Sequence, residues 1–307
     1  MNPASLQYLC IGHCCHDRVG GKNILGGTAS YSALVARQLG LRAGILTSVG
    51  TDFGFRDIFE KNDIRFWSKP AATTTVFENI YLDGRRIQYL HKRAETLFAD
   101  DVPTECLPAP IVLFCPIAGE VDFSVFQKFP HALKGATIQG WLRQWNEKGR
   151  VLPQEMDWSE LAAADVVIMS DADIQGFERK IPEIASFVKV LVMTQGAQGA
   201  QVFFGNQQLH YPAFPVKEVD ATGAGDVFAT AFLLKYSETR DLAQAAGFAH
   251  CAASFVVEGV GIANLASLEK IGARFEKYLN LLNLSQPPQL FSTATKTPYK
   301  APSKSRK

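Results

Sequence analysis

The sequence lacks an excess of charge, a long apolar run and paired cysteines, and each absence excludes a class of protein. It has 31 basic and 30 acidic residues, so no global field favours nucleic acid or an anionic membrane. No apolar run approaches the roughly 18–20 residues of a membrane span, and the stretch after Met1–Ser5 is too short for a secretory signal. The six cysteines show no CxxC spacing, which favours reduced core thiols. We therefore expect a cytoplasmic protein without a membrane or nucleic-acid partner.

Residues 285–307 differ in composition from the rest of the chain. Pro, Ser, Thr and Lys dominate this segment, and they bury too little surface to offset the entropy lost on ordering. The whole chain is 47% hydrophobic, which suffices for one large core. We expect one globular domain over residues 1–284 and a disordered basic tail over residues 285–307. A tail that binds RNA or an acidic partner is the alternative.

Short apolar runs bounded by turn residues recur along the chain. They lie at residues 6–12, 43–49, 111–115, 136–141, 165–169 and 188–194. Continuous apolarity is typical of strands that are buried on both faces. Helix-like stretches alternate with these runs, at residues 28–39, 53–61 and 174–187. The pattern predicts a three-layer α/β/α sandwich with a mostly parallel central sheet.

A β-rich region interrupts this alternation. Residues 73–82 and 85–91 meet at Asp83-Gly84, a dipeptide suited to a tight hairpin turn. The polar, glycine-rich segment that follows the first strand could pair with this hairpin. We therefore predict a small β-lid over residues 13–25 and 64–91, with substrate between the lid and the sheet. Exposed lid edges favour a homodimer through the lid.

The most informative segment runs from Asp220 to Asp226 and reads Asp-Ala-Thr-Gly-Ala-Gly-Asp, directly before a helix-like run. Gly223 and Gly225 let backbone N–H groups converge, and a helix N-terminus adds partial positive charge, so a phosphate can bind there. Asp226 falls in the first helical turn. It either complements the helix dipole or accepts a proton from a hydroxyl that attacks a phosphoryl group. Motifs elsewhere in the chain decide between these functions.

This segment resembles the C-terminal signature of the ribokinase (PfkB) family of carbohydrate kinases, Asp-Thr-x-Gly-Ala-Gly-Asp, with Ala221 in place of Thr. The resemblance implies a ribokinase-like fold and transfer of the γ-phosphoryl group of ATP to an alcohol. It also implies that Asp226 is the catalytic base and that the amides of Gly223, Ala224 and Gly225 form the anion hole. Further family landmarks follow in the expected order, from Gly12 to about Gly261.

Two landmarks near the N-terminus imply where the acceptor binds. Gly12 and Asp17 match the Gly-x-x-x-x-Asp that follows the first strand in the family, and Gly26-Gly27 matches its di-glycine. The resemblance implies that Asp17 binds substrate hydroxyls and that Gly26 and Gly27 let the substrate approach the backbone. The alternative for Asp17 is a solvated loop carboxylate.

Two further features concern the identity of the acceptor. Tyr31 stands where ribokinases proper have Asn, which argues against ribose. The sequence from Gln139 to Arg143, Gln-Gly-Trp-Leu-Arg, resembles the myo-inositol kinase branch. Tyr31 and Arg143 are therefore acceptor candidates, although Arg143 could instead pair with a nearby acid. The implied acceptor is a sugar, a myo-inositol-like cyclitol or a nucleoside.

The donor nucleotide is implied by a second group of residues. Thr194, Gly196 and Gly199 follow an apolar strand and resemble the family's Thr-x-Gly-x-x-Gly, where a hydroxyl and backbone amides lie beside the nucleotide phosphates. Gly259 belongs to a segment that resembles the one beside the adenine pocket. Thr222 completes this set of cofactor-binding candidates, and the resemblance leaves open whether K+ binds near it.

Magnesium is implied by the family, which places Asn-x-x-Glu after a central strand. This chain has Ser170-Asp171-Ala172-Asp173 there. Asp173 could replace the Glu as an outer-shell ligand, because Mg2+ keeps several of its waters. The segment His13-Cys14-Cys15-His16 also offers metal-ligating side chains. Adjacent residues of an extended segment alternate between faces, however, and that disfavours one shared site.

The altered Ser170–Asp173 segment and Ala221 leave a second function open. A protein of the same fold could bind a sugar or a nucleotide as a sensor without turning it over. ATP binding without product would identify such a sensor. Other nucleotide-binding folds have little support, because neither a Gly-x-x-x-x-Gly-Lys-Ser/Thr loop nor a strand-linked Gly-x-Gly-x-x-Gly occurs in the chain.

Overall fold

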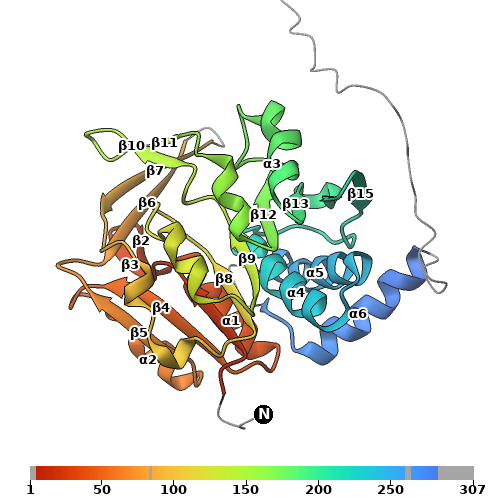
Figure 1. Ribbon diagram of the computed structural model, residues 1–307, viewed down its shortest axis with the longest axis horizontal. Coiled ribbons are helices and arrows are strands. Elements are labelled where there is room, and N and C mark those ends of the chain that lie inside the picture. The colour runs from red at the N-terminus through yellow and green to blue at the C-terminus, as the bar shows by residue number, and fades with distance from the viewer. Residues whose placement is uncertain (1–4, 83–84, 260–263, 283–307) are drawn as a thin grey trace, which may run out of the picture.

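A nine-stranded sheet runs through the computed structural model, which describes residues 5–82, 85–259 and 264–282 (Figure 1). Its strands are β1 (Tyr8–Ile11), β4 (Ala43–Val49), β5 (Arg65–Pro70), β8 (Ile111–Phe114), β9 (Leu133–Thr137), β12 (Val166–Ser170), β13 (Val190–Thr194), β14 (Ala200–Phe204) and β15 (Gln207–Tyr211). The order is β15-β14-β13-β12-β9-β8-β1-β4-β5. Neighbours from β5 to β13 pair in parallel, whereas β14 and β15 pair antiparallel. The predicted α/β class with a mostly parallel sheet is confirmed.

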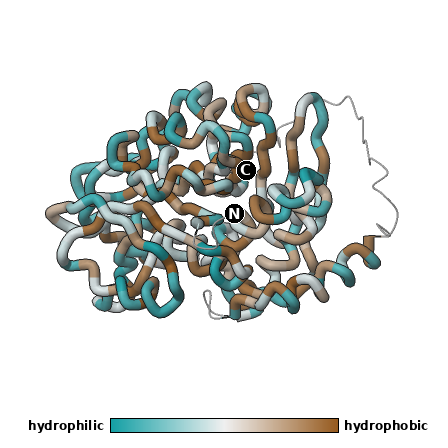
Figure 2. The backbone as a smooth tube through the Cα atoms, turned by 60° about the horizontal axis from the view of Figure 1, so that its bottom comes forward, coloured by the Kyte–Doolittle hydropathy of each residue, from teal (hydrophilic) through white to brown (hydrophobic). Residues whose placement is uncertain are grey.

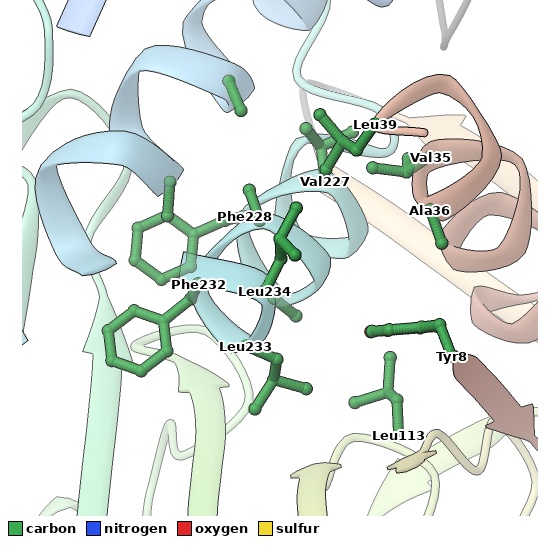
Figure 3. Packing of buried hydrophobic residues seen from close by; sticks show 14 of the residues in the cluster. Tyr8, Val35, Ala36, Leu39, Leu113, Val227, Phe228, Phe232, Leu233 and Leu234 are labelled. Carbon is green, nitrogen blue, oxygen red and sulfur yellow. The ribbon is translucent and has the colours of Figure 1, made fainter. Parts of the chain in front are cut away.

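One face of the sheet is covered by the four long helices. These are α1 (Thr28–Gln38), α4 (Ala224–Thr239), α5 (Leu242–Val257) and α6 (Leu268–Leu281). Side chains of β1 alternate between the faces, so that Tyr8 joins the cluster beneath these helices while Leu9 joins the opposite one. In Figure 3, Phe228 and Phe232 of α4 lie on the α5 side of the helix, and Tyr8 lies near α1. This packing fixes the start of α4 over the ends of the central strands.

The opposite face carries two short 3₁₀ helices, at Phe123–Lys128 and Trp158–Ala163, and one short α-helix, α3 (Ile181–Phe187). The helix expected over residues 174–187 therefore covers only its second half. Gly176 has a φ of 91°, which an α-helix does not allow, and a proline stands in the first turn of α3. The helix expected over residues 53–61 is likewise shortened, to α2 (Arg56–Lys61).

The strand predicted at residues 136–141 is wrong in its second half, because β9 ends at Thr137. The chain then turns, with the Trp141 amide donating to the Ile138 carbonyl over 3.0 Å. Trp141 is buried by contacts with residues outside the sheet and not by strand pairing. Its indole N–H donates to the Val121 carbonyl over 2.8 Å, and its ring stacks on Phe123 at 4.5 Å between centroids. Apolar composition alone did not distinguish this burial from strand pairing.

A second sheet forms the lid. Its strands are β2 (Cys15–Val19), β3 (Lys22–Gly26), β6 (Thr75–Leu82) and β7 (Arg85–Lys92), in the order β3-β2-β6-β7. The predicted pairing of residues 13–25 with the later hairpin is confirmed, and the Asp83-Gly84 turn lies outside the described residues. The predicted lid range 64–91 is too long, because β5 pairs with β4 in the main sheet. Figure 1 shows the lid beside the main sheet.

A short hairpin from the segment after β9 extends the lid. It consists of β10 (Arg143–Trp145) and β11 (Val151–Pro153), and Figure 1 shows it beside β7. The Leu90 amide of β7 donates to the Gly149 carbonyl over 2.8 Å, and Tyr89 bridges Arg150. This hairpin was not predicted from the sequence, and it forms part of the wall of a cavity beside the candidate active site.

Hydrophobic stretches lie mainly toward the interior of the described chain, and hydrophilic stretches lie on its outer loops (Figure 2). None of the helices within the described ranges is both long and apolar enough to cross a membrane. The basic tail predicted at residues 285–307 lies outside the described residues.

Candidate active site

The start of α4 forms the centre of the candidate site. Gly223, with a φ of 83°, is the residue before the helix, and Asp226 lies in the first turn. The loop is closed by the Ala224 amide, which donates to the Ala221 carbonyl over 3.1 Å. The first N–H groups of a helix have no partner within the helix and carry partial positive charge. This end of α4 is therefore an electropositive helix N-terminus, and its use as an anion hole stays a prediction.

The Asp226 carboxyl group has a pKa raised to about 7. Burial is the main cause, because a charged carboxylate is poorly solvated there. A hydrogen bond from the Thr28 side chain opposes the shift, and the negative charges of Asp17 and Asp173 add to it. A carboxylate with a pKa near neutrality can both accept and release a proton at physiological pH.

A pocket of about 280 Å³ lies between the lid and the start of α4. We call it the acceptor pocket after the residues for which the sequence predicts acceptor binding. Its lining includes most of the predicted acceptor and catalytic residues, namely Asp17, Gly27, Tyr31, Arg143, Gly223, Gly225 and Asp226. Tyr31 donates its hydroxyl to the Leu25 carbonyl over 2.9 Å. Burial raises the pKa of Tyr31, and the charges of Asp17 and Asp226 add to this shift. The two carboxylates and the phenol therefore share one pocket.

The di-glycine shapes this pocket through close approach. A side chain at Gly26 would collide with the carboxylate of Asp17, which lies two residues along β2 from Cys15, the direct strand partner of Gly26. A side chain at Gly27 would collide with the His13 carbonyl oxygen, and its φ of 95° disfavours other residues. The di-glycine thus lets Asp17 lie against β3 and lets α1 begin at the pocket wall.

Arg143 and His13 each contact a backbone carbonyl group that their motifs did not indicate. The Arg143 guanidinium donates to the Ile117 carbonyl over 2.9 Å and lies over the ring of Phe77, at 5.6 Å from its centroid. It lines the acceptor pocket. The His13 ring contacts the Thr75 hydroxyl at 2.7 Å and the Glu95 carbonyl at 2.9 Å, which gives this histidine a structural position between sheet and lid.

A larger pocket of about 500 Å³, the donor pocket, lies on the other side of the α4 start. Thr194, Gly196 and Gly199 line it at the end of β13, as predicted for a nucleotide site, and Ala224 lines it from α4. Its apolar walls include Phe214, Phe228, Ala253 and Val257. The donor and acceptor pockets share Ala221 and Gly225, so they meet at the N-terminus of α4.

Two cofactor-binding candidates lie elsewhere in the structure. Thr222 lines the acceptor pocket, and its amide and hydroxyl donate to Asp220 over 2.9 Å and 2.7 Å. Gly259 packs against Asn264, where an added Cβ would approach the Asn264 Cβ to 2.6 Å. It is not part of the donor-pocket lining among the described residues, and its neighbours 260–263 lie outside them.

Asp173 belongs to a polar ring at the end of β12. One carboxylate oxygen accepts from the Ser170 amide and hydroxyl, each over 2.8 Å. The other oxygen accepts from the Gln139 side chain over 2.8 Å. Within the described ranges, no cluster of three His, Cys, Asp or Glu side chains could hold a metal ion. Asp173 is therefore held by protein donors near the site rather than in a metal cage.

The structure adds lining residues that the motifs did not reveal. Asn79 and Gln88 lie opposite each other on β6 and β7, joined by a side-chain hydrogen bond of 3.0 Å, and both line the acceptor pocket. His250 lines the donor pocket, and burial lowers its pKa to about 4, so it is neutral at physiological pH. The alternation along the hairpin was the one available signal for Asn79 and Gln88. No motif in the sequence indicated a role for His250, which belongs to a helix rich in small residues.

Comparisons with known proteins agree with this fold. The family model described as pfkB family carbohydrate kinase matches residues 150–269. A deoxyribokinase of Salmonella typhi is 36% identical over 282 residues, which are 83% of this chain and 88% of the relative. A nucleoside kinase of Methanothermobacter thermautotrophicus is 26% identical over 256 residues, which are 78% of this chain and 80% of the relative. The structure of Arabidopsis thaliana ribokinase complexed with ribose and ATP matches with a TM-score of 0.72 at 18% identity, covering 89% of this chain and 99% of that one.

An α/β fold with two pockets that meet at a helix N-terminus, together with these relatives, defines a phosphotransferase with an alcohol group as acceptor. The chain belongs to the ribokinase (PfkB) family of carbohydrate kinases.

Proposed function

We propose that the protein transfers the γ-phosphoryl group of ATP to a hydroxyl of a sugar, a cyclitol or a nucleoside, with Asp226 as general base. The position of Asp226 carries this proposal. It lies in the acceptor pocket, one residue after Gly225, which lines both pockets. A hydroxyl in one pocket and a phosphate in the other would therefore meet beside its carboxylate.

The reaction follows from that placement. Asp17 and its neighbours would hold the acceptor so that one hydroxyl faces Asp226. Asp226 would accept the hydroxyl proton while the hydroxyl oxygen forms a bond to the γ-phosphorus. The bond from that phosphorus to the β-phosphate oxygen would break, releasing ADP. The partial positive charge at the N-terminus of α4 would stabilise the charge on the transferred group.

Magnesium, when bound, neutralises charge on the nucleotide phosphates. A single nearby carboxylate, that of Asp173, fits a magnesium ion that is bound mainly by the nucleotide phosphates and by water, because such an ion needs few direct protein ligands. Asp173, held by Ser170 and Gln139, would act on it through water. A requirement for K+ near Thr222 stays a prediction.

The donor pocket favours a nucleotide as the phosphoryl donor. Its phenylalanine and small-residue walls at Phe214, Phe228 and Ala253 suit the flat face of a base. The deciding assay measures phosphoryl transfer from ATP and from pyrophosphate, which has no base, with ribose, deoxyribose, myo-inositol and nucleosides as acceptors. Transfer from ATP to at least one acceptor supports the proposal. Binding of ATP without any transfer would instead favour a sensor.

The pH dependence of the rate provides a further prediction. Asp226 must be ionised to accept a proton, and its pKa is raised to about 7, mainly by burial. We expect kcat/KM to rise as the pH increases through about 7 and then to level off. Initial rates between pH 5.5 and 9 at subsaturating acceptor measure this profile. A profile that is already level at pH 5.5 would contradict the assignment of Asp226.

A further inference from the structure

A second chamber of about 290 Å³ adjoins the acceptor pocket, and the proposed reaction assigns no ligand to it, although Asp173 belongs to its lining. The two cavities share Gln88, Gln139 and Arg143 as a common wall. The far side of the chamber is built by the β10–β11 hairpin, which docks on β7. The two cavities therefore lie on either side of these three side chains, and an acceptor in the first pocket would enter the chamber past them.

The walls of this side chamber combine apolar surface with amide groups. Leu142, Leu152 and Pro153 supply apolar contacts, and Gln88 and Gln175 supply carboxamides. A carboxamide offers both donors and an acceptor, which matches the mixed edge of a nucleobase. The hydroxyl groups of a free sugar or a cyclitol would gain nothing from the apolar part of this lining.

Arg150 adds a planar cation to the same chamber. Its side chain makes no ion pair, side-chain hydrogen bond or ring contact with any residue of the described part of the chain, whereas Arg143 is bonded to Ile117. Its backbone is fixed by the hairpin, since its amide donates to Asn146 over 3.0 Å. The hairpin thus fixes the backbone of Arg150, and the exposed guanidinium at the end of its side chain can stack on the face of a flat ring.

We propose that the preferred acceptor is a nucleoside, with its sugar in the acceptor pocket and its base in the side chamber beside Arg150. This inference rests on the proposed kinase function and names its acceptor class. The base would be enclosed by Leu142, Leu152 and Pro153, while a sugar hydroxyl faces Asp226. The hairpin is then a specificity element, because it forms the wall that a nucleoside requires and a free sugar does not.

The test compares kcat/KM for cytidine and adenosine with that for ribose and myo-inositol, using the full chain with ATP and magnesium. We expect at least one nucleoside to exceed both smaller acceptors by about tenfold or more. Arg150→Gln should reduce kcat/KM for that nucleoside by about tenfold, the loss expected when a base loses a stacking partner. The same substitution should leave ribose turnover unchanged. Lys148→Gln, which removes an equal charge from the same hairpin outside the chamber, serves as the control.

Three outcomes would overturn the inference. The first is turnover of ribose or myo-inositol that equals or exceeds that of every nucleoside. The second is a preference for a sugar acid or a sugar phosphate, which would assign the arginines to an anionic group. The third is a nucleoside preference that Arg150→Gln leaves intact. If the proposed kinase function itself is wrong, no acceptor will be phosphorylated although ATP binds. That result differs from all three outcomes above.

Discussion

Replacement of Asp226 by Asn is expected to lower kcat by about 10³-fold, the range found for loss of a positioned general base. Asn keeps the size of the side chain and its polar contact with Thr28, but it cannot accept the hydroxyl proton. Acceptor binding through Asp17 should persist, so KM should change much less than kcat. Steady-state kinetics with the best acceptor and saturating ATP measure both constants.

Thermal unfolding of the same variant supplies the control. The Asp226 pKa is raised in the folded protein to about 7, above its value in the unfolded chain, so the folded state binds more protons between these two values. The free energy of unfolding therefore falls as the pH rises through this range. Asp226→Asn should remove that slope and unfold at a higher temperature than the wild type at pH 8. Near-normal turnover in a folded variant would refute the assignment of the base.

Replacement of Gly27 by Ala is expected to impair both stability and acceptor use. The added Cβ would collide with the His13 carbonyl, and the φ of 95° costs a non-glycine residue about 1–3 kcal/mol. Relief of the collision must move α1 relative to the lid, and α1 carries Thr28 and Tyr31 at the pocket wall. We expect a loss of about 2–4 kcal/mol in unfolding free energy and a fall of about 10²-fold in kcat/KM for the acceptor.

Gly40→Ala separates these two effects. Gly40 has a similar φ of 85°, but no atom lies within 4 Å of the added Cβ. This variant should lose about 1 kcal/mol in stability and retain wild-type kinetics. Chemical denaturation and kinetics of the two variants measure the difference. Equal effects of the two substitutions would show that backbone strain alone, and not the approach to His13, explains the di-glycine.

The turn and helix start that carry Asp226 could be predicted from the sequence because their signal is local. Seven consecutive residues from Asp220 to Asp226 contain the turn, the helix start and the carboxylate, and the structure places them at one end of α4. The lid was predictable for a similar reason. Its hairpin has β-rich arms around one turn dipeptide, although the boundary with β5 depended on which sheet Arg65–Pro70 would join.

The side chamber could not be predicted in this way. Its walls come from β7, from the β10–β11 hairpin and from the loop after β12, which meet only through tertiary contacts. The residues around Trp141 looked like a strand, because apolar content reports burial and not the partner. Ser170, Gln139 and Asp173 likewise form their ring across two strand ends. The spacing of residues along the sequence does not show which distant segments meet in the folded protein.

The docking of the β10–β11 hairpin on β7 also determines which edge strand of the lid sheet can pair with a strand of another chain. In the order β3-β2-β6-β7, the outer strands are β3 and β7. The Gly149 carbonyl and the Arg150 bridge occupy β7 near Leu90, so strand addition there is obstructed. Among the described lid strands this leaves β3, and the charged Lys22 at its start is a residue type that discourages edge-to-edge aggregation. The hairpin that shapes the chamber thus also obstructs β-sheet extension at one of the two lid edges.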